Sequence, residues 1–101
     1  MSLDLDFLDR LLAAPGPSSF ESRPAHVFRA QAESHGLETQ QDAYGSVFAI
    51  AGAGRTPRLL LSGHIDEIGL LIQHVDDQGM AWFDTVGGWD SQQLVGQRVR
   101  I

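Results

Sequence analysis

The chain has 101 residues, and thirteen acidic side chains against seven basic ones give a net charge of −6 at pH 7. Nucleic acids and anionic membranes bind basic patches, so this balance argues against both as partners. Cysteine is absent, which excludes a disulfide framework and a thiolate zinc site. Any metal must therefore use His, Asp and Glu ligands. Because the apolar runs are too short to span a bilayer and the first residues are acidic, we expect a cytoplasmic protein.

Residues 4–13 are expected to form a short helix. Their apolar side chains fall on one stripe, which consists of Phe7, Leu8, Leu11 and Leu12. Asp4 and Asp6 favour the positive end of such a helix, and the Ala-Pro-Gly-Pro run at 14–17 ends it.

A second helix is expected to follow this run. Ser18 and Glu21 have the spacing of a capping box, so the helix can begin near Phe20 or one turn later, after the start signals of Ser22 and Pro24. Its inward side would consist of Val27, Phe28 and Ala32, with His35 as a further candidate. The glycine that follows His35 suits the position just after the helix end.

The rest of the chain has strand patterns. Strands are expected at 37–41, 46–51, 58–62, 68–75, 80–86 and 97–101. The continuous leucine run Leu59–Leu61 predicts a strand buried on both faces. A turn at 76–79 joins two alternating segments and predicts a β-hairpin.

The expected secondary structure changes near residue 67. Residues 1–66 resemble layered helix and strand, whereas residues 67–101 read as all-β. We therefore predict an α/β unit over 1–66 and the start of a separate β-rich domain over 67–101. A strand at the end of the sequence would need a partner, so we expect these residues to form the front part of a longer protein.

The chemical candidates lie directly after the leucine run. His64 and Asp66 are two positions apart, so on a strand they would share a face, with Glu67 on the other. A histidine backed by a carboxylate is typical of metal sites. The pair also fits a histidine at a strand end beside a solvated aspartate, because this spacing is common. Two residues do not complete a catalytic zinc site. The other histidines, His26, His35 and His74, have no local metal-binding signature.

Other motifs have simpler interpretations. Asp66 and Glu67 could form a glycosidase pair, but adjacent strand residues fit that geometry poorly. Gly52 and Gly54 resemble only part of a phosphate loop. The aromatic residues near the hairpin could stack a ligand, although packing explains them as well.

Taken together, several segments resemble the M42 family of metallo-aminopeptidases, the group of glutamyl and tetrahedral aminopeptidases. The resemblance lies in Leu61–Gly69, Gly87–Asp90 and Leu94–Val99, and in the opening segment Leu11–Glu21. Three motifs in this order are more specific than the His64-x-Asp66 spacing alone, and the resemblance extends over essentially the whole chain.

The resemblance implies an α/β fold. The chain would form the start of an α/β/α phosphorylase/hydrolase-like metallopeptidase domain. It would be followed by the first strands of an inserted β-rich dimerisation domain, a β-barrel or PDZ-like unit.

The resemblance also implies a metal-dependent aminopeptidase that acts on peptides and holds two divalent metal ions, zinc or cobalt, in each full-length subunit. His64 would bind one metal and Asp66 would be the catalytic residue that supports it, while Glu67 is not the general base. A homo-oligomer, dimer-based or dodecameric, would be expected.

Two departures accompany the resemblance. Gly45-Ser46 stands where the family often has Gly-Asn. The chain is also much shorter than family members, and it lacks counterparts of the general base and the remaining ligands. We therefore expect residues 1–101 alone to be inactive. A non-catalytic binding or assembly module derived from a metallopeptidase and a cellulase-type glycan hydrolase remain alternatives.

Overall fold

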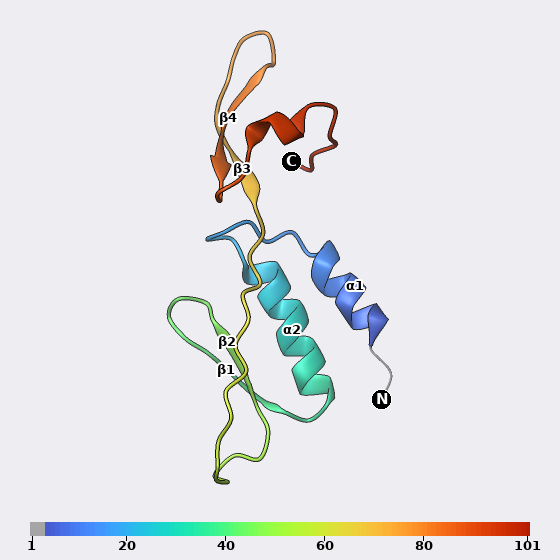
Figure 1. Cartoon of the computed structure of the whole chain (residues 1–101), viewed down its shortest axis with the longest axis vertical. Coiled ribbons are helices and arrows are strands. Elements are labelled where there is room, and N and C mark those ends of the chain that lie inside the picture. Colours follow the sequence, from blue (N-terminus) through green and yellow to red (C-terminus); the bar gives the residue numbers. More distant parts are fainter. Residues whose placement is uncertain (1–3) are drawn as a thin grey trace.

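The computed structural model describes residues 4–101, so residues 1–3 of the acidic start lie outside the described residues. The described part is elongated and measures 59 × 32 × 22 Å. Two helices and one β-hairpin lie at one end, and a second hairpin lies at the other (Figure 1). The elements are α1 (Leu5–Ala13), α2 (Ser22–Ser34), β1 (Glu38–Gln41), β2 (Val47–Ile50), β3 (Gly69–Val75), β4 (Ala81–Val86) and the 3-10 helix η1 (Ser91–Leu94).

Both predicted helices are present. Asp4 caps α1, because its carboxylate accepts the backbone N–H of Phe7 at 2.9 Å. The helix α2 begins at Ser22, between the two predicted starts, and Gly36 follows its end at φ +72°, a left-handed conformation that favours glycine. The two helices contact each other along their length (Figure 1).

The predicted capping box is wrong. The Ser18 hydroxyl donates to the carboxylate of Asp66 instead of capping α2. Glu21, the residue before α2, accepts the backbone N–H of Ser19, and its side chain makes no cap bond within the described chain. A local helix signal is therefore overridden by a contact between distant segments.

The strands β1 and β2 form an antiparallel hairpin that contacts α2. Their positions agree with the two strands expected after the second helix. The turn between them is held by Asp42, whose Oδ1 accepts the backbone N–H groups of Tyr44 and Ser46, each at 2.9 Å.

The strands β3 and β4 form the predicted hairpin, with a β-bulge between Ile72 and His74. Asp76 holds its turn by accepting the backbone N–H groups of Gln78 and Met80. The segment after β4 runs through η1, so the expected all-β character of residues 67–101 is only partly correct.

Two predicted strands are absent from the described chain. Leu59, Leu60 and Leu61 belong to neither helix nor strand and are 85%, 75% and 86% exposed. The prediction of a buried strand here is wrong, because no described strand pairs with this segment to satisfy its backbone groups. The strand expected at 97–101 is absent for the same reason.

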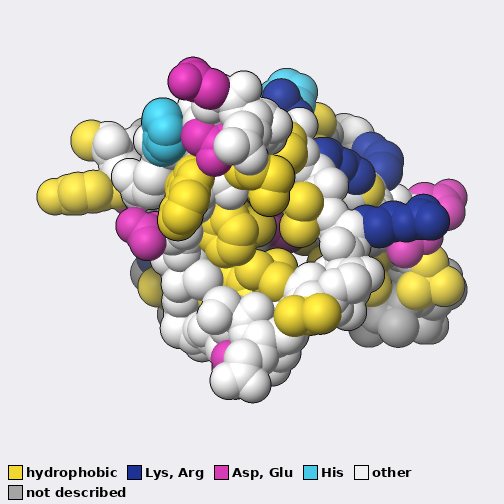
Figure 2. Space-filling view, turned by 90° about the horizontal axis from the view of Figure 1, so that it is seen from above, with side chains coloured by type: hydrophobic (Ala, Val, Ile, Leu, Met, Phe, Trp, Pro, Cys, Tyr) yellow, Lys and Arg dark blue, Asp and Glu magenta, His cyan; other side chains and the backbone are white. Residues whose placement is uncertain are grey.

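The core is small. Within residues 4–101 the buried side chains are those of Pro24, Ala25 and Ala32, all on α2. The inward side predicted for α2 is correct for Ala32, while Val27 and Phe28 are half-buried and His35 is exposed. Many large apolar side chains are exposed, and Figure 2 shows hydrophobic groups gathered on the face at the end of the molecule that carries β3 and β4. None of the described helices is long and apolar enough to cross a membrane.

Candidate metal-ligand site

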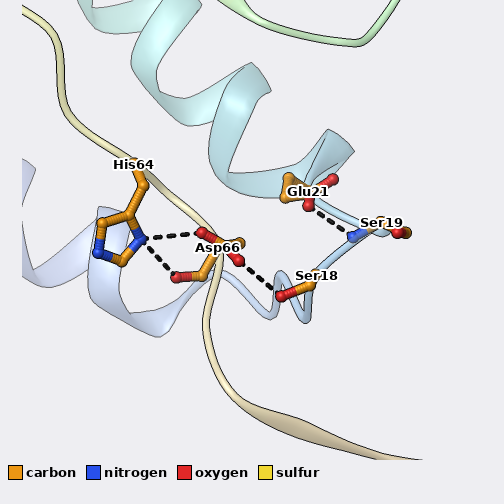
Figure 3. Close-up of polar contacts among 5 residues, drawn as sticks. All are labelled: Ser18, Ser19, Glu21, His64 and Asp66. Atoms are coloured by element: carbon orange, nitrogen blue, oxygen red, sulfur yellow. Dashed lines mark hydrogen bonds and ion pairs between the residues drawn. The ribbon is translucent and has the colours of Figure 1, made fainter. Parts of the chain in front are cut away.

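The candidate site lies where the segment leading to β3 passes the loop between α1 and α2 (Figure 3). His64 and Asp66 come from the first segment, and Ser18 comes from the loop. The structure brings His64 and Asp66 together, as their two-residue spacing predicts. It does not place them at the end of an interior strand, so that prediction is wrong.

The imidazole of His64 contacts Asp66 through one ring nitrogen. Nδ1 lies 2.9 Å from Oδ1 of Asp66 and 3.2 Å from its carbonyl oxygen. Both oxygens are acceptors, so Nδ1 must carry the proton. In the neutral ring this leaves the lone pair of Nε2 free, as a metal ligand requires. The His64 side chain is 85% exposed, so Nε2 is open to a ligand.

Asp66 is bonded through both carboxylate oxygens. Oδ1 faces His64, and Oδ2 accepts the hydroxyl of Ser18 at 2.5 Å (Figure 3). These hydrogen bonds, first that of Ser18 and then that of His64, lower the pKa of the Asp66 carboxyl below its ordinary value. Asp66 is therefore ionised at neutral pH and keeps the proton of His64 on Nδ1.

Glu67 bonds the loop between α1 and α2 rather than the imidazole of His64. Its carboxylate accepts the backbone N–H of Gly16 at 2.8 Å. Its backbone pairs with the same loop, because the Glu67 N–H donates to the Gly16 carbonyl at 2.9 Å and the Ser18 N–H donates to the Glu67 carbonyl at 3.3 Å. A parallel bridge between Pro17 and Glu67 results.

The sequence did not identify Ser18 or Gly16 as neighbours of the site. The residue pattern of this loop predicts a helix stop followed by a capping box, and both signals are local. The resemblance of Leu11–Glu21 to the opening segment of the family is the one sequence signal that could have pointed to this loop, but it does not identify Ser18 or Gly16.

The described residues do not form a complete metal site. Within residues 4–101 no group of three or more His, Asp or Glu side chains could hold a metal ion. His26, His35 and His74 lie on α2, just after α2 and on β3, and none of them joins His64 and Asp66 in such a group. The donor set still fits one ligand of a metal centre, because a neutral imidazole with a free Nε2 and a carboxylate on Nδ1 is the usual form of a metal-binding histidine.

Comparison with known proteins identifies the class. Residues 45–101, more than half of the chain, match the family model of the M42 glutamyl aminopeptidases. The chain therefore belongs to the M42 family, as its motifs predict.

Individual relatives agree with the family match. The chain is 30% identical over 99 residues to the Escherichia coli (strain K12) protein named "Putative aminopeptidase FrvX", and the match covers 98% of this chain and 28% of that protein. It is 25% identical over 104 residues to the lysyl aminopeptidase of Pyrococcus furiosus, covering 98% and 29%.

A solved structure has the same fold. It is the TET aminopeptidase of the marine sediment archaeon Thaumarchaeota archaeon SCGC AB-539-E09, which superimposes with a TM-score of 0.79 at 35% identity over 87% of this chain and 25% of that one. The chain is thus mixed α/β, and it spans under a third of the length of these relatives.

Proposed function

We propose that the complete protein containing these residues is a metal-dependent aminopeptidase that releases N-terminal residues from peptides, and that His64 is one of its metal ligands. The observation that carries the proposal is the 2.9 Å contact between Nδ1 of His64 and Oδ1 of Asp66, which leaves Nε2 free and exposed. The names of the similar proteins, which are aminopeptidases, support the reaction class.

The metal centre would be completed by further ligands, because this chain supplies one proposed ligand, His64, and Asp66 supports it. A catalytic zinc needs three protein ligands and an open position, and a two-metal site needs more. We propose two divalent ions, zinc or cobalt, because imidazole and carboxylate ligands suit both. Residues 1–101 alone would then be inactive.

A bound divalent ion supplies Lewis-acid polarisation of the scissile carbonyl and a water of lowered pKa. The residues of this chain contribute orientation. Asp66 fixes the tautomer of His64 and the direction of Nε2. Ser18 holds the carboxylate that does this.

We further propose that residues 1–66 belong to an α/β/α catalytic domain and residues 67–101 to an inserted β-rich dimerisation domain of a cytoplasmic homo-oligomer. The separation of β3 and β4 from the helices supports the division (Figure 1). Exposed apolar side chains on the second hairpin, such as Trp82 and Phe83, support an interface there.

The alternative functions have less support. Glycan hydrolysis needs two free carboxyl groups across a sugar, but Asp66 bonds Ser18 and His64 while Glu67 bonds Gly16. A non-catalytic module receives no support from relatives named as aminopeptidases.

The test is the replacement His64→Ala in the complete protein, with His74→Ala as the matched control. His74 is also an exposed histidine, and it lies on β3. Metal content after dialysis and hydrolysis of a peptide anilide are measured. We expect His64→Ala to lose metal and activity and His74→Ala to keep both. Unchanged metal content and activity in His64→Ala would exclude the proposed ligand.

A further inference from the structure

The Ser18 hydroxyl occupies the one carboxylate oxygen of Asp66 that His64 does not use. The distance from Oγ to Oδ2 is 2.5 Å, and the distance from Nδ1 of His64 to Oδ1 is 2.9 Å. The three side chains thus form a hydrogen-bonded series in which Asp66 lies in the middle and is bonded on both sides (Figure 3). A hydroxyl that donates to an ionised carboxylate makes a short, charge-assisted bond.

We propose that Ser18 is a positioning residue of the metal centre, which orients the Asp66 carboxylate so that His64 presents Nε2 in one direction. This inference rests on the proposed function, because it concerns the same metal ligand. Ser18 does not touch the metal or the substrate, and it acts only through Asp66.

The position of Ser18 is fixed by contacts other than its own side chain. Its backbone N–H donates to the Glu67 carbonyl at 3.3 Å, and Gly16 is bonded to Glu67 through both its N–H and its carbonyl. These bonds tie residues 16–18 to the residue next to Asp66. These backbone bonds hold Ser18 in place before a metal binds, so its hydroxyl already lies at Oδ2 of Asp66.

The Asp66 carboxylate needs the hydrogen bond from Ser18 because the surrounding protein does not enclose it. Its side chain is 38% exposed and that of His64 is 85% exposed. Packing alone does not restrict either side chain to a single rotamer. Without the hydroxyl, the carboxylate can rotate about its bond to Cβ, and the hydrogen bond to Nδ1 no longer fixes the imidazole.

The test uses the complete protein and the variants Ser18→Ala and Ser18→Thr, with Ser22→Ala as the matched control. Ser22 is an exposed serine at the start of α2, four residues away from Ser18. The dissociation constant for cobalt is measured by competition with a chelator. The visible spectrum of the cobalt protein and the kcat and KM for a peptide anilide are also recorded.

Loss of an outer partner of a metal ligand costs about tenfold or more in metal affinity. We expect Ser18→Ala to raise the cobalt dissociation constant about tenfold and to alter the cobalt spectrum. KM should change less than kcat, because substrate is not touched. Ser18→Thr keeps the hydroxyl and should restore affinity and spectrum, and Ser22→Ala should match the wild type.

Two outcomes would overturn the inference. Wild-type affinity and spectrum in Ser18→Ala would show that the hydroxyl does not position the site. Equal loss in Ser18→Ala and Ser18→Thr, with equal loss of thermal stability, would assign Ser18 to loop folding alone. If His64→Ala also leaves metal binding unchanged, the proposed function fails. If His64→Ala abolishes binding and Ser18→Ala does not affect it, only this inference fails.

Discussion

Glu67 accepts the backbone N–H of Gly16 at 2.8 Å, although the two residues are 51 positions apart in the sequence. This bond and the backbone bridge beside it join the loop between α1 and α2 to the segment that carries His64 and Asp66. The geometry of the candidate site thus depends on a contact that lies outside it.

Replacement of Glu67 by Ala should loosen this loop. A net contribution of about 1 kcal/mol is typical of one such hydrogen bond, so we expect a loss of that size in the free energy of unfolding. Hydrogen exchange at the Gly16 amide should become faster. Glu67→Gln keeps an acceptor oxygen and should retain most of the protection. Equal protection in wild type and Glu67→Ala would show that the bond does not hold the loop.

A methyl group at residue 69 should separate the same two segments. A Cβ added to Gly69 would lie 2.9 Å from Cβ of Pro17, which is too close, whereas one added to Gly63 meets no described atom within 4 Å. We expect Gly69→Ala to destabilise the protein by about 1–3 kcal/mol, as overpacking does. Gly63→Ala, the control, should unfold at the wild-type temperature. Thermal unfolding followed by circular dichroism compares them, and equal melting temperatures would refute the predicted clash.

Ser19 has φ +76°, a left-handed conformation that is unfavourable for a residue with a Cβ atom. Its N–H donates to the Glu21 carboxylate, which holds the turn. A β-branched side chain tolerates this conformation least, so Ser19→Val should cost about 1–2 kcal/mol of stability. Ser19→Gly should be at least as stable as wild type. Chemical denaturation gives the free energy of unfolding of both variants. If Ser19→Val is as stable as Ser19→Gly, the backbone at residue 19 is not strained.

Asp76 makes the stability of the β3–β4 hairpin depend on pH. The backbone N–H of Met80, first, and then the Trp82 and Gln78 N–H groups bond its carboxylate and lower its pKa below the ordinary value near 4. The pKa of Asp76 is lower in the folded state than in the unfolded state. Its contribution to the stability of the hairpin is therefore fully present above the unfolded-state pKa. It is lost as pH falls through the folded-state value.

A titration checks this prediction. Exchange of the Met80 amide and the carboxyl carbon shift of Asp76 are followed by NMR from pH 6 to about pH 2, the range that contains the ordinary aspartate pKa. We expect protection of the amide to fall together with the titration of Asp76. Asp76→Asn keeps an acceptor but does not titrate, so its protection should not change at that step. A similar step in Asp76→Asn would assign the pH dependence to another group.

Much of the local structure follows from the sequence. The apolar stripe and Asp4 predict α1, and the turn residues at 76–79 predict the β3–β4 hairpin, because these signals act between residues that are close in the chain. For β1 and β2 the sequence predicts the two strands but not their pairing in a hairpin. The contact between His64 and Asp66 follows from their spacing for the same reason. Family membership also follows from ordered motifs in the sequence.

Other features were decided only by the tertiary structure. Leu59–Leu61 has the composition of a buried strand, but burial and pairing depend on a partner strand, and among residues 4–101 no strand pairs with these exposed leucines. Ser18 has the spacing of a helix cap, yet it bonds Asp66 across 48 residues. A periodic pattern reports on neighbours in the chain, whereas a contact between distant segments depends on how the loop folds back. The sequence by itself therefore determines the pair of His64 and Asp66, and the tertiary structure determines that Ser18 and Glu67 support it.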